Sequence, residues 1–373
     1  MSWDFGREIT DDLRFVAGSV AHSGRMFAAV CAGIERRSPA AQAATTTTLA
    51  IVLAVLVGCA MHLQEVWWAA ISAYVSTNPQ SIARGLRRIL GTLAGAMLAI
   101  TSIGWLAYDP PACCLALFVV TIVGVIGFNV SRHGNAWLFM SITFGMVLLT
   151  SLPNPEEAFS VGVGRIIEVV IGTCIAIAIA TLFAGKAASP GTPLRGWSDL
   201  LGGGLPITLH AIRSGVTVAL IPFVWSTFVL PGVSQMAITL VALLATPVLT
   251  DPQETHRRIV GRGLQRLLGC FIGGLSALAL LGLGFGSMLP WLITLAGGVW
   301  LFAYVQHGSH DATYVGTQAG VVFITTLVQG SGPPESILPG IDRFAGMSLG
   351  LSMLFVTMFL IGPPTLATAR APR

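Results

Sequence analysis

Residues 84–91 read Arg-Gly-Leu-Arg-Arg-Ile-Leu-Gly, and residues 262–269 read Arg-Gly-Leu-Gln-Arg-Leu-Leu-Gly. The second stretch lies 178 positions after the first, counted from Arg84 to Arg262. Another pair of stretches, which begin at Arg165 and Arg343, is separated by the same 178 positions. Separate motifs that share one spacing indicate an internal repeat. We therefore expect the chain to consist of two similar halves.

The composition of the chain places most of it in lipid. Hydrophobic residues make up 54% of the 373 positions and charged residues only 10%, whereas soluble domains carry about 25% charged residues. A helix needs roughly 20 mostly apolar residues to cross the hydrocarbon core. The chain contains twelve candidate apolar stretches, at residues 45–63, 66–77, 89–108, 112–128, 136–152, 165–184, 207–230, 233–250, 267–285, 289–305, 314–328 and 343–361. The stretch at 66–77 is short for a span, so it is either tilted, broken or longer than these bounds.

These stretches predict an all-α polytopic membrane protein with about 12 transmembrane helices, arranged as two parallel six-helix repeats. An even number of spans brings both halves into the membrane in the same direction, around a pseudo-two-fold axis along the membrane normal. Repeat one covers residues 45–186, and repeat two covers residues 207–362 after a cytoplasmic hinge at 187–206. Residues 1–44 form an amphipathic segment that lies on the cytoplasmic membrane surface or packs on the end of the bundle, and residues 363–373 form a cytoplasmic tail.

The placement of basic residues predicts the orientation. When both termini are placed in the cytoplasm, 17 of the 20 Lys and Arg residues fall on the cytoplasmic side. Positive charge is retained on that side of a membrane, so we expect a multi-pass protein of a bacterial inner membrane. The three exceptions, Arg165, Arg213 and Arg343, lie at or near the ends of predicted spans.

Those three arginines are the candidate substrate-binding residues. An ionisable side chain within a membrane segment is costly and therefore points to function, and guanidinium groups bind carboxylates through two parallel hydrogen bonds. Glu168 and Asp342 lie close to Arg165 and Arg343 in the sequence and are candidates for proton coupling. The alternative is that these acidic and basic residues form neutralised structural pairs near the membrane interface.

Two further sets of residues have both a structural and a functional interpretation. Trp67 and Trp68 anchor a span at the membrane interface, or they stack on an aromatic acid and belong to the substrate site. Glycines spaced by four residues near predicted helix starts allow close helix packing, or they line a translocation path. These glycines are Gly91, Gly95, Gly269 and Gly273.

Other classes of function find no support in the sequence. No catalytic triad order, phosphate-binding loop or dinucleotide fingerprint occurs, so we expect no enzyme activity and no cofactor. The six cysteines form no CxxC pair, and His307 with His310 offers only two metal ligands where a closed site needs more. We therefore expect no metal. We expect no nucleic-acid partner, because no basic run is interleaved with aromatic residues.

Three segments in fixed order resemble a known family. Residues 67–75 read Trp-Trp-Ala-Ala-Ile-Ser-Ala-Tyr-Val, residues 78–80 read Asn-Pro-Gln, and residues 88–96 read Arg-Ile-Leu-Gly-Thr-Leu-Ala-Gly-Ala. This combination resembles the fusaric acid resistance (FUSC) family, also called the aromatic acid exporter family. The second half repeats the pattern more weakly at residues 251–253 and 266–270.

The resemblance implies export of aromatic or other small organic acid anions, driven by the proton-motive force, with resistance to weak-acid toxins such as fusaric acid. It also implies a periplasmic adaptor protein as a partner, and kinship with plant malate channels in which two six-helix units enclose an anion path. The chain departs from typical members because it has only a short hinge where they often carry a large cytoplasmic domain. The alternatives are a passive organic-anion channel and a membrane scaffold subunit without its own path. A single chain or a homodimer can complete the path.

Overall fold

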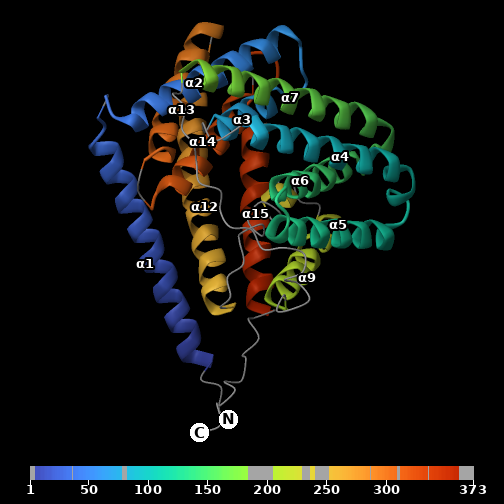
Figure 1. The fold of residues 1–373 in the computed structure, drawn as a ribbon. Helices are drawn as coiled ribbons and strands as arrows, with labels where there is room; N and C mark the ends of the chain where they lie inside the picture. Colours follow the sequence, from blue (N-terminus) through green and yellow to red (C-terminus); the bar gives the residue numbers. More distant parts are fainter. Residues whose placement is uncertain are drawn as a thin grey trace.

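The computed structural model describes residues 5–35, 37–77, 82–183, 205–228, 236–239, 252–285, 287–308, 311–334 and 336–360 (Figure 1). The regular elements within these ranges are all helices, as predicted. They are α1 (Phe5–Ala32), α2 (Pro39–Ala60), α3 (Val66–Ser76), α4 (Ile82–Leu106), α5 (Pro110–Val130), α6 (Gly134–Ser151), the short η1 (Pro155–Glu157), α7 (Ala158–Phe183), α9 (Leu205–Ala219), α10 (Ile221–Phe228), α12 (Pro252–Leu281), α13 (Met288–Gln306), α14 (Thr313–Leu327) and α15 (Leu338–Leu360).

Seven helical segments in the described ranges are long and apolar enough to cross a membrane. They are α2, α4, α5, α6, the continuous segment of η1 and α7, the part of α12 from Val260 to Leu281, and α13. The chain is therefore an all-helical, multi-pass membrane protein by length and composition. The predicted hinge at 187–206 lies outside the described residues except for its last two, the predicted span at 233–250 lies outside them except for 236–239, and the tail at 363–373 lies wholly outside them.

Several helices begin earlier than the apolar stretches that predicted them. α4 begins at Ile82 and α12 at Pro252, so the basic clusters before residues 89 and 267 lie within helices rather than in loops. Similarly, α7 begins at Ala158, which places Arg165 two turns inside the helix and not at its start. Hydropathy marks the apolar part of a helix, whereas arginine is also a good helix former and extends it.

The predicted span at 207–230 is divided into two helices. α9 ends at Ala219 and α10 begins at Ile221, with Leu220 between them. Pro222, the second residue of α10, has no backbone N–H to continue the hydrogen-bond ladder of α9, and its ring crowds the preceding turn. A proline is tolerated at the start of a helix, because the backbone N–H that it lacks would have no partner there. Pro39 and Pro110 begin α2 and α5 in this way, after the capping side chains of Ser38 and Asp109.

Helices in the two halves of the chain pack in matching pairs. α4 packs on α6 and α12 packs on α14, and in both pairs two glycines allow the close approach. A side-chain carbon at Gly91 or Gly95 would collide with the backbone of Ala136 or Met140 in α6, and Gly269 and Gly273 meet the backbone of α14 in the same way. α2 also packs on α13, and α5 packs on α9.

The long helices of the two halves do not share one direction. In Figure 1, α4, α5 and α7 run across the view, whereas α12 and α15 run up it. Two parallel bundles around one membrane normal require spans that are close to parallel. The arrangement of twelve helices in two parallel repeats therefore stays a prediction.

The N-terminal helix packs against the second half. α1 contacts α12, α13 and α14, and its Phe27 ring lies 6.4 Å from the Phe302 ring of α13. His22 of α1 lies 3.5 Å from the carboxylate of Asp311, before α14. The sequence predicts that this segment either lies on the membrane surface or packs on the bundle. In the structure, α1 packs on helices of the bundle.

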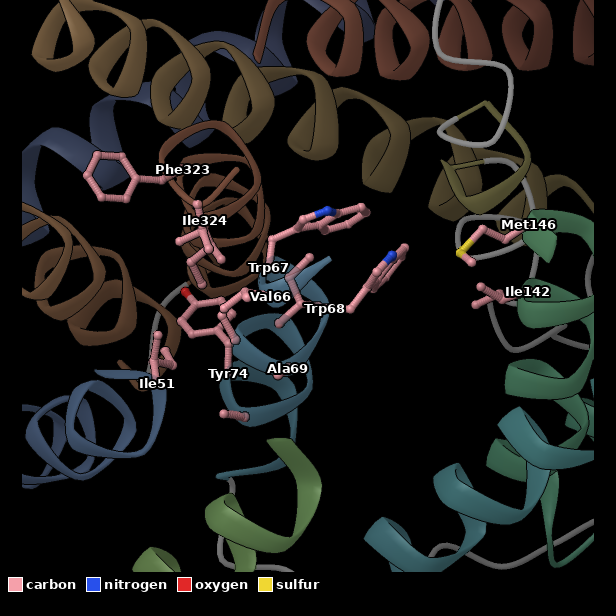
Figure 2. Packing of buried hydrophobic residues seen from close by; sticks show 14 of the residues in the cluster. Ile51, Val66, Trp67, Trp68, Ala69, Tyr74, Ile142, Met146, Phe323 and Ile324 are labelled. Atoms are coloured by element: carbon pink, nitrogen blue, oxygen red, sulfur yellow. The ribbon is translucent and has the colours of Figure 1, made fainter. Parts of the chain in front are cut away.

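Helix α3 is buried between other helices and positions the site. Nine of its eleven residues are buried, and it contacts α2, α7 and α14. The Tyr74 hydroxyl donates a hydrogen bond of 3.0 Å to the carbonyl of Gly316 in α14, which joins the two halves. Figure 2 shows Tyr74 beside Ile51, while Trp68 extends from the same helix toward Met146 of α6.

Candidate functional site

A pocket of about 350 Å³ lies where α3, α6, α7 and α15 meet. It brings together five of the residues predicted from the sequence as substrate-binding or proton-coupling. These are Trp67, Trp68, Arg165, Glu168 and Asp342. The remaining lining is formed by Gln64, Glu65, Met146, Thr150, Glu157, Ser160, Val161 and Gly164.

Arg165 presents its guanidinium to the pocket in an unusual environment. The side chain is only 3% exposed, and its Cζ lies 3.0 Å from the centroid of the Trp68 ring. Its Nε and Nη1 atoms have no hydrogen-bond partner among the described residues. A guanidinium stacked on an indole uses its face for the cation–π contact and leaves the N–H groups at its edge available.

Glu168 lies one turn after Arg165 on α7 and is 2% exposed. Its Oε1 accepts a hydrogen bond of 2.9 Å from the backbone N–H of Glu65, and the carboxylate of Glu65 accepts one from the indole N–H of Trp67. Within the described residues Arg165 and Glu168 form no direct ion pair, although their opposite charges attract through space. The loop before α3 is thus tied to α7 at the pocket.

The two tryptophans provide an aromatic wall. Their ring centroids are 4.0 Å apart and the planes are tilted by 30°. Trp67 is 4% exposed and Trp68 is 6% exposed. Both are therefore enclosed by protein, which differs from the membrane-interface placement that was the alternative for them.

Carboxylates outnumber the single described guanidinium at this pocket. Glu65, Glu157, Glu168 and Asp342 all line it. Glu65 and Glu157 were not among the predicted site residues, because both lie between predicted spans beside other polar residues and nothing in their spacing ties them to Arg165. Glu65 and Glu168 lie close enough to repel one another, so the pocket places negative charge beside the guanidinium of Arg165.

The remaining predicted residues do not join this pocket. Arg213 is buried in α9, which packs on α5, and its carbonyl accepts a hydrogen bond of 2.8 Å from the hydroxyl of Thr217. The backbone of Arg343 lies in the second turn of α15, but its side chain lies outside the described part of the structure. Gly91, Gly95, Gly269 and Gly273 lie between helices and away from the pocket lining. Within the described ranges, no three His, Cys, Asp or Glu side chains converge as metal ligands.

Comparison with known proteins supports the resemblance seen in the sequence. Residues 42–195 match the model of the Fusaric acid resistance protein family (FUSC). This interval contains α2 to α7, and with them every described residue of the pocket except Asp342. No curated protein and no solved structure matches the chain. The family match and the seven apolar helices indicate a membrane protein with a role in transport or resistance.

Proposed function

We propose that the protein is a secondary-active exporter of aromatic or other small organic acid anions, driven by the proton-motive force, and that it confers resistance to weak-acid toxins such as fusaric acid. The single observation that carries the proposal is the buried guanidinium of Arg165. It is stacked on Trp68 and has no hydrogen-bond partner for Nε or Nη1 among the described residues. A carboxylate is the small group that matches both the charge and the edge geometry of these donors.

The rest of the pocket suits the other end of such a substrate. Trp67, Trp68, Met146 and Val161 supply apolar surface beside Arg165. Aromatic rings pack favourably against indole, in offset or edge-to-face arrangements. A molecule with a carboxylate on one side and an aromatic ring on the other can therefore satisfy both parts of the site.

Glu168 and Asp342 are proposed to couple anion binding to protons. An incoming carboxylate is repelled by ionised acidic side chains that line the same pocket. Export driven by an inward proton flow requires exchange, so we propose that the repulsion from ionised Glu168 and Asp342 helps to release the anion outside, and that these carboxylates then take up protons there and carry them inward on the empty site. The electrical part of the driving force is worth about 2.3 kcal/mol per charge for each 100 mV, and a potential that is negative inside moves an anion outward.

The placement in the cell and the assembly complete the proposal. The clustering of basic residues supports an inner-membrane location with both termini in the cytoplasm. The matched packing of α4 on α6 and of α12 on α14 supports a duplicated ancestry. A periplasmic adaptor protein and a homodimer, both suggested by the resemblance or by the repeat, stay proposals that copurification after crosslinking in cells can test.

The experiment that tests the function uses purified protein in lipid vesicles and labelled benzoate. A secondary-active carrier shows counterflow, in which an outward gradient of unlabelled benzoate drives the label inward against its own gradient. R165Q is expected to abolish counterflow, and R87Q, at a half-buried residue outside the pocket, is expected to leave it intact. Benzoate flux without counterflow would instead identify a passive channel, and the absence of any benzoate flux in wild type would support a scaffold without its own path.

A further inference from the structure

Arg88 is a second buried arginine whose charge no acidic side chain neutralises within the described residues. It is 4% exposed, and its Nη2 donates a hydrogen bond of 3.1 Å to the hydroxyl of Ser72 on α3. Its Cζ lies 4.3 Å from the centroid of the Phe139 ring on α6, and its Nε has no hydrogen-bond partner in the described part of the chain. Burying a charge with one hydroxyl and one ring as its only compensation is costly, so a structural role alone explains it poorly.

The neighbouring residue, Arg87, is an arginine that is not fully buried. Arg87 is half-buried, and its guanidinium donates to the backbone carbonyls of Ala83 and Arg132. Arg87 and Arg88 are consecutive, so they differ only in which side of α4 they occupy. The sequence run alone gives no sign of the difference.

Arg88 lies close to the pocket that contains Arg165. Ser72, its partner, follows Trp68 by four residues on α3, so the two share one face of the helix and lie about 6 Å apart along its axis. Arg165 stacks on Trp68, and its charge is close enough to that of Arg88 for the two to repel. Arg165 of α7 and Arg88 of α4 thus contact consecutive turns of one face of α3, and both positive charges would be stabilised by an anion bound between them.

The second half of the chain contains the same construction. Arg266, 178 positions after Arg88, is 4% exposed in α12. Its Nη2 donates to the hydroxyl of Thr239 at 3.3 Å, and its Nε also lacks a hydrogen-bond partner among the described residues. Among the residues that the structure describes, a buried arginine whose hydrogen bond goes to a hydroxyl therefore occurs at equivalent places in both halves, which argues against an accident of packing.

We infer that Arg88 is a second carboxylate-binding position, and that the substrate anion passes between Arg165 and Arg88 along the Trp68–Ser72 face of α3. This inference rests on the proposed export of organic acid anions and adds the next step of the path. Arg165 receives or releases the carboxylate at the pocket, and Arg88 holds it one turn further along the helix. Removing Arg88 therefore slows transfer while the pocket at Arg165 still binds.

The test uses full-length protein, benzoate as the probe, and the variants R88Q, R88K and R87Q. R88Q is expected to reduce benzoate counterflow by about tenfold or more, because it removes a charge-assisted hydrogen-bond pair. R88K keeps the charge but lacks the planar fork, so it is expected to fall between R88Q and wild type. R87Q is the matched control and is expected to transport normally. Wild-type counterflow in both R88Q and R88K would overturn the inference.

A second measurement separates this inference from the proposed function and does not depend on transport. Benzoate is expected to raise the thermal unfolding temperature of wild type strongly, of R165Q weakly through Arg88, and of the R165Q/R88Q double variant not at all. If R165Q loses the entire shift, a single position exists and the inference fails while the proposed function stands. If wild type shows no shift and no benzoate flux, the proposed function itself fails.

Discussion

At the scale of single residues, the contact between Arg165 and Trp68 controls the chemistry of the pocket. The indole holds the guanidinium in one plane and shields it from solvent, which strengthens its attraction for an anion. Arg165 contacts Trp68 and, among the described residues, forms no ion pair with Glu168. The pocket can therefore bind an anion without first breaking an internal ion pair.

Substitution of Trp68 tests this contact. W68F is expected to lower benzoate affinity severalfold, because phenylalanine is a weaker cation–π partner than tryptophan and fills less of the pocket. The measurement is benzoate binding by titration calorimetry on purified protein. W105F is the matched control, since Trp105 on α4 is 67% exposed, and it is expected to bind as wild type does. Equal affinity in W68F and wild type would show that the stacking is not used.

The acidic side chains that line the pocket lead to the opposite prediction, a gain in benzoate affinity on substitution. Glu156 and Glu157 are consecutive in η1, but only Glu157 lines the pocket. E157Q is expected to strengthen benzoate binding by about two- to threefold, because it removes a negative charge that repels the substrate across a partly solvated distance. E156Q is expected to change the affinity less. A weaker affinity in E157Q would mean that this carboxylate contacts the substrate favourably.

The sequence predicted much of this site and missed part of it. Arg165 and Glu168 are three residues apart on an apolar helix, so their common face was predictable, and both line the pocket. Trp67 and Trp68 line it too, but a tryptophan pair is equally typical of a membrane interface. Arg88 was missed because burial depends on neighbouring helices, which a basic run does not reveal.

At the scale of helices, close packing of backbones holds α4 against α6. G95A places a methyl group against the backbone carbonyl of Met140, which cannot move aside as a flexible side chain can. A loss of about 1–3 kcal/mol in the free energy of unfolding is expected from such overpacking. G104A on the same helix meets nothing within 4 Å and is expected to be neutral or slightly stabilising. Thermal unfolding of the purified variants checks both.

The helices also show where hydropathy misleads. The predicted start at residue 89 missed the first two turns of α4, which carry Arg84, Arg87 and Arg88. The start of α12 was missed by fifteen residues, from 252 to 267, for the same reason. By contrast, α3, α5, α6 and α13 begin and end close to the prediction, because turn-forming residues or capping side chains bound their apolar stretches.

At the scale of the whole molecule, a chain of hydroxyl groups joins the two halves next to a histidine. His307 follows α13, and its Nε2 lies 2.9 Å from the hydroxyl of Thr47 on α2. The hydroxyl of Thr77, after α3, also donates to that of Thr47, at 3.0 Å. Burial lowers the pKa of His307 below its ordinary value of 6.5, since the charged imidazolium is poorly solvated there.

A pH dependence of stability follows from this position. The folded protein takes up a proton at His307 only below the pH at which the unfolded chain does, so the free energy of unfolding is expected to fall as pH drops below about 6.5. H307Q is expected to flatten this part of the profile of unfolding temperature against pH. H22Q changes a histidine that is 55% exposed. This variant is expected to keep the wild-type dependence of unfolding temperature on pH. An unchanged slope in H307Q would assign the acid sensitivity to other groups.

The overall arrangement was the least predictable level. Composition and apolar stretches were enough to predict an all-helical membrane protein, whereas the repeat indicated by the spacing of 178 stays a prediction. The relative direction of the two halves depends on contacts between residues far apart in the chain, such as Tyr74 and Gly316, which are 242 positions apart. No local pattern contains that information, and Figure 1 shows the long helices of the two halves crossing.

The short central helix has a consequence for how the protein is made. With 11 residues, α3 is about 16 Å long, roughly half the thickness of the hydrocarbon core. It cannot settle as an independent span when it leaves the ribosome. One of its supports, α14, is synthesised more than 200 residues later. Biogenesis must therefore keep an incomplete intermediate at the insertion machinery until the last helices arrive, and truncated chains are expected to be degraded rather than inserted.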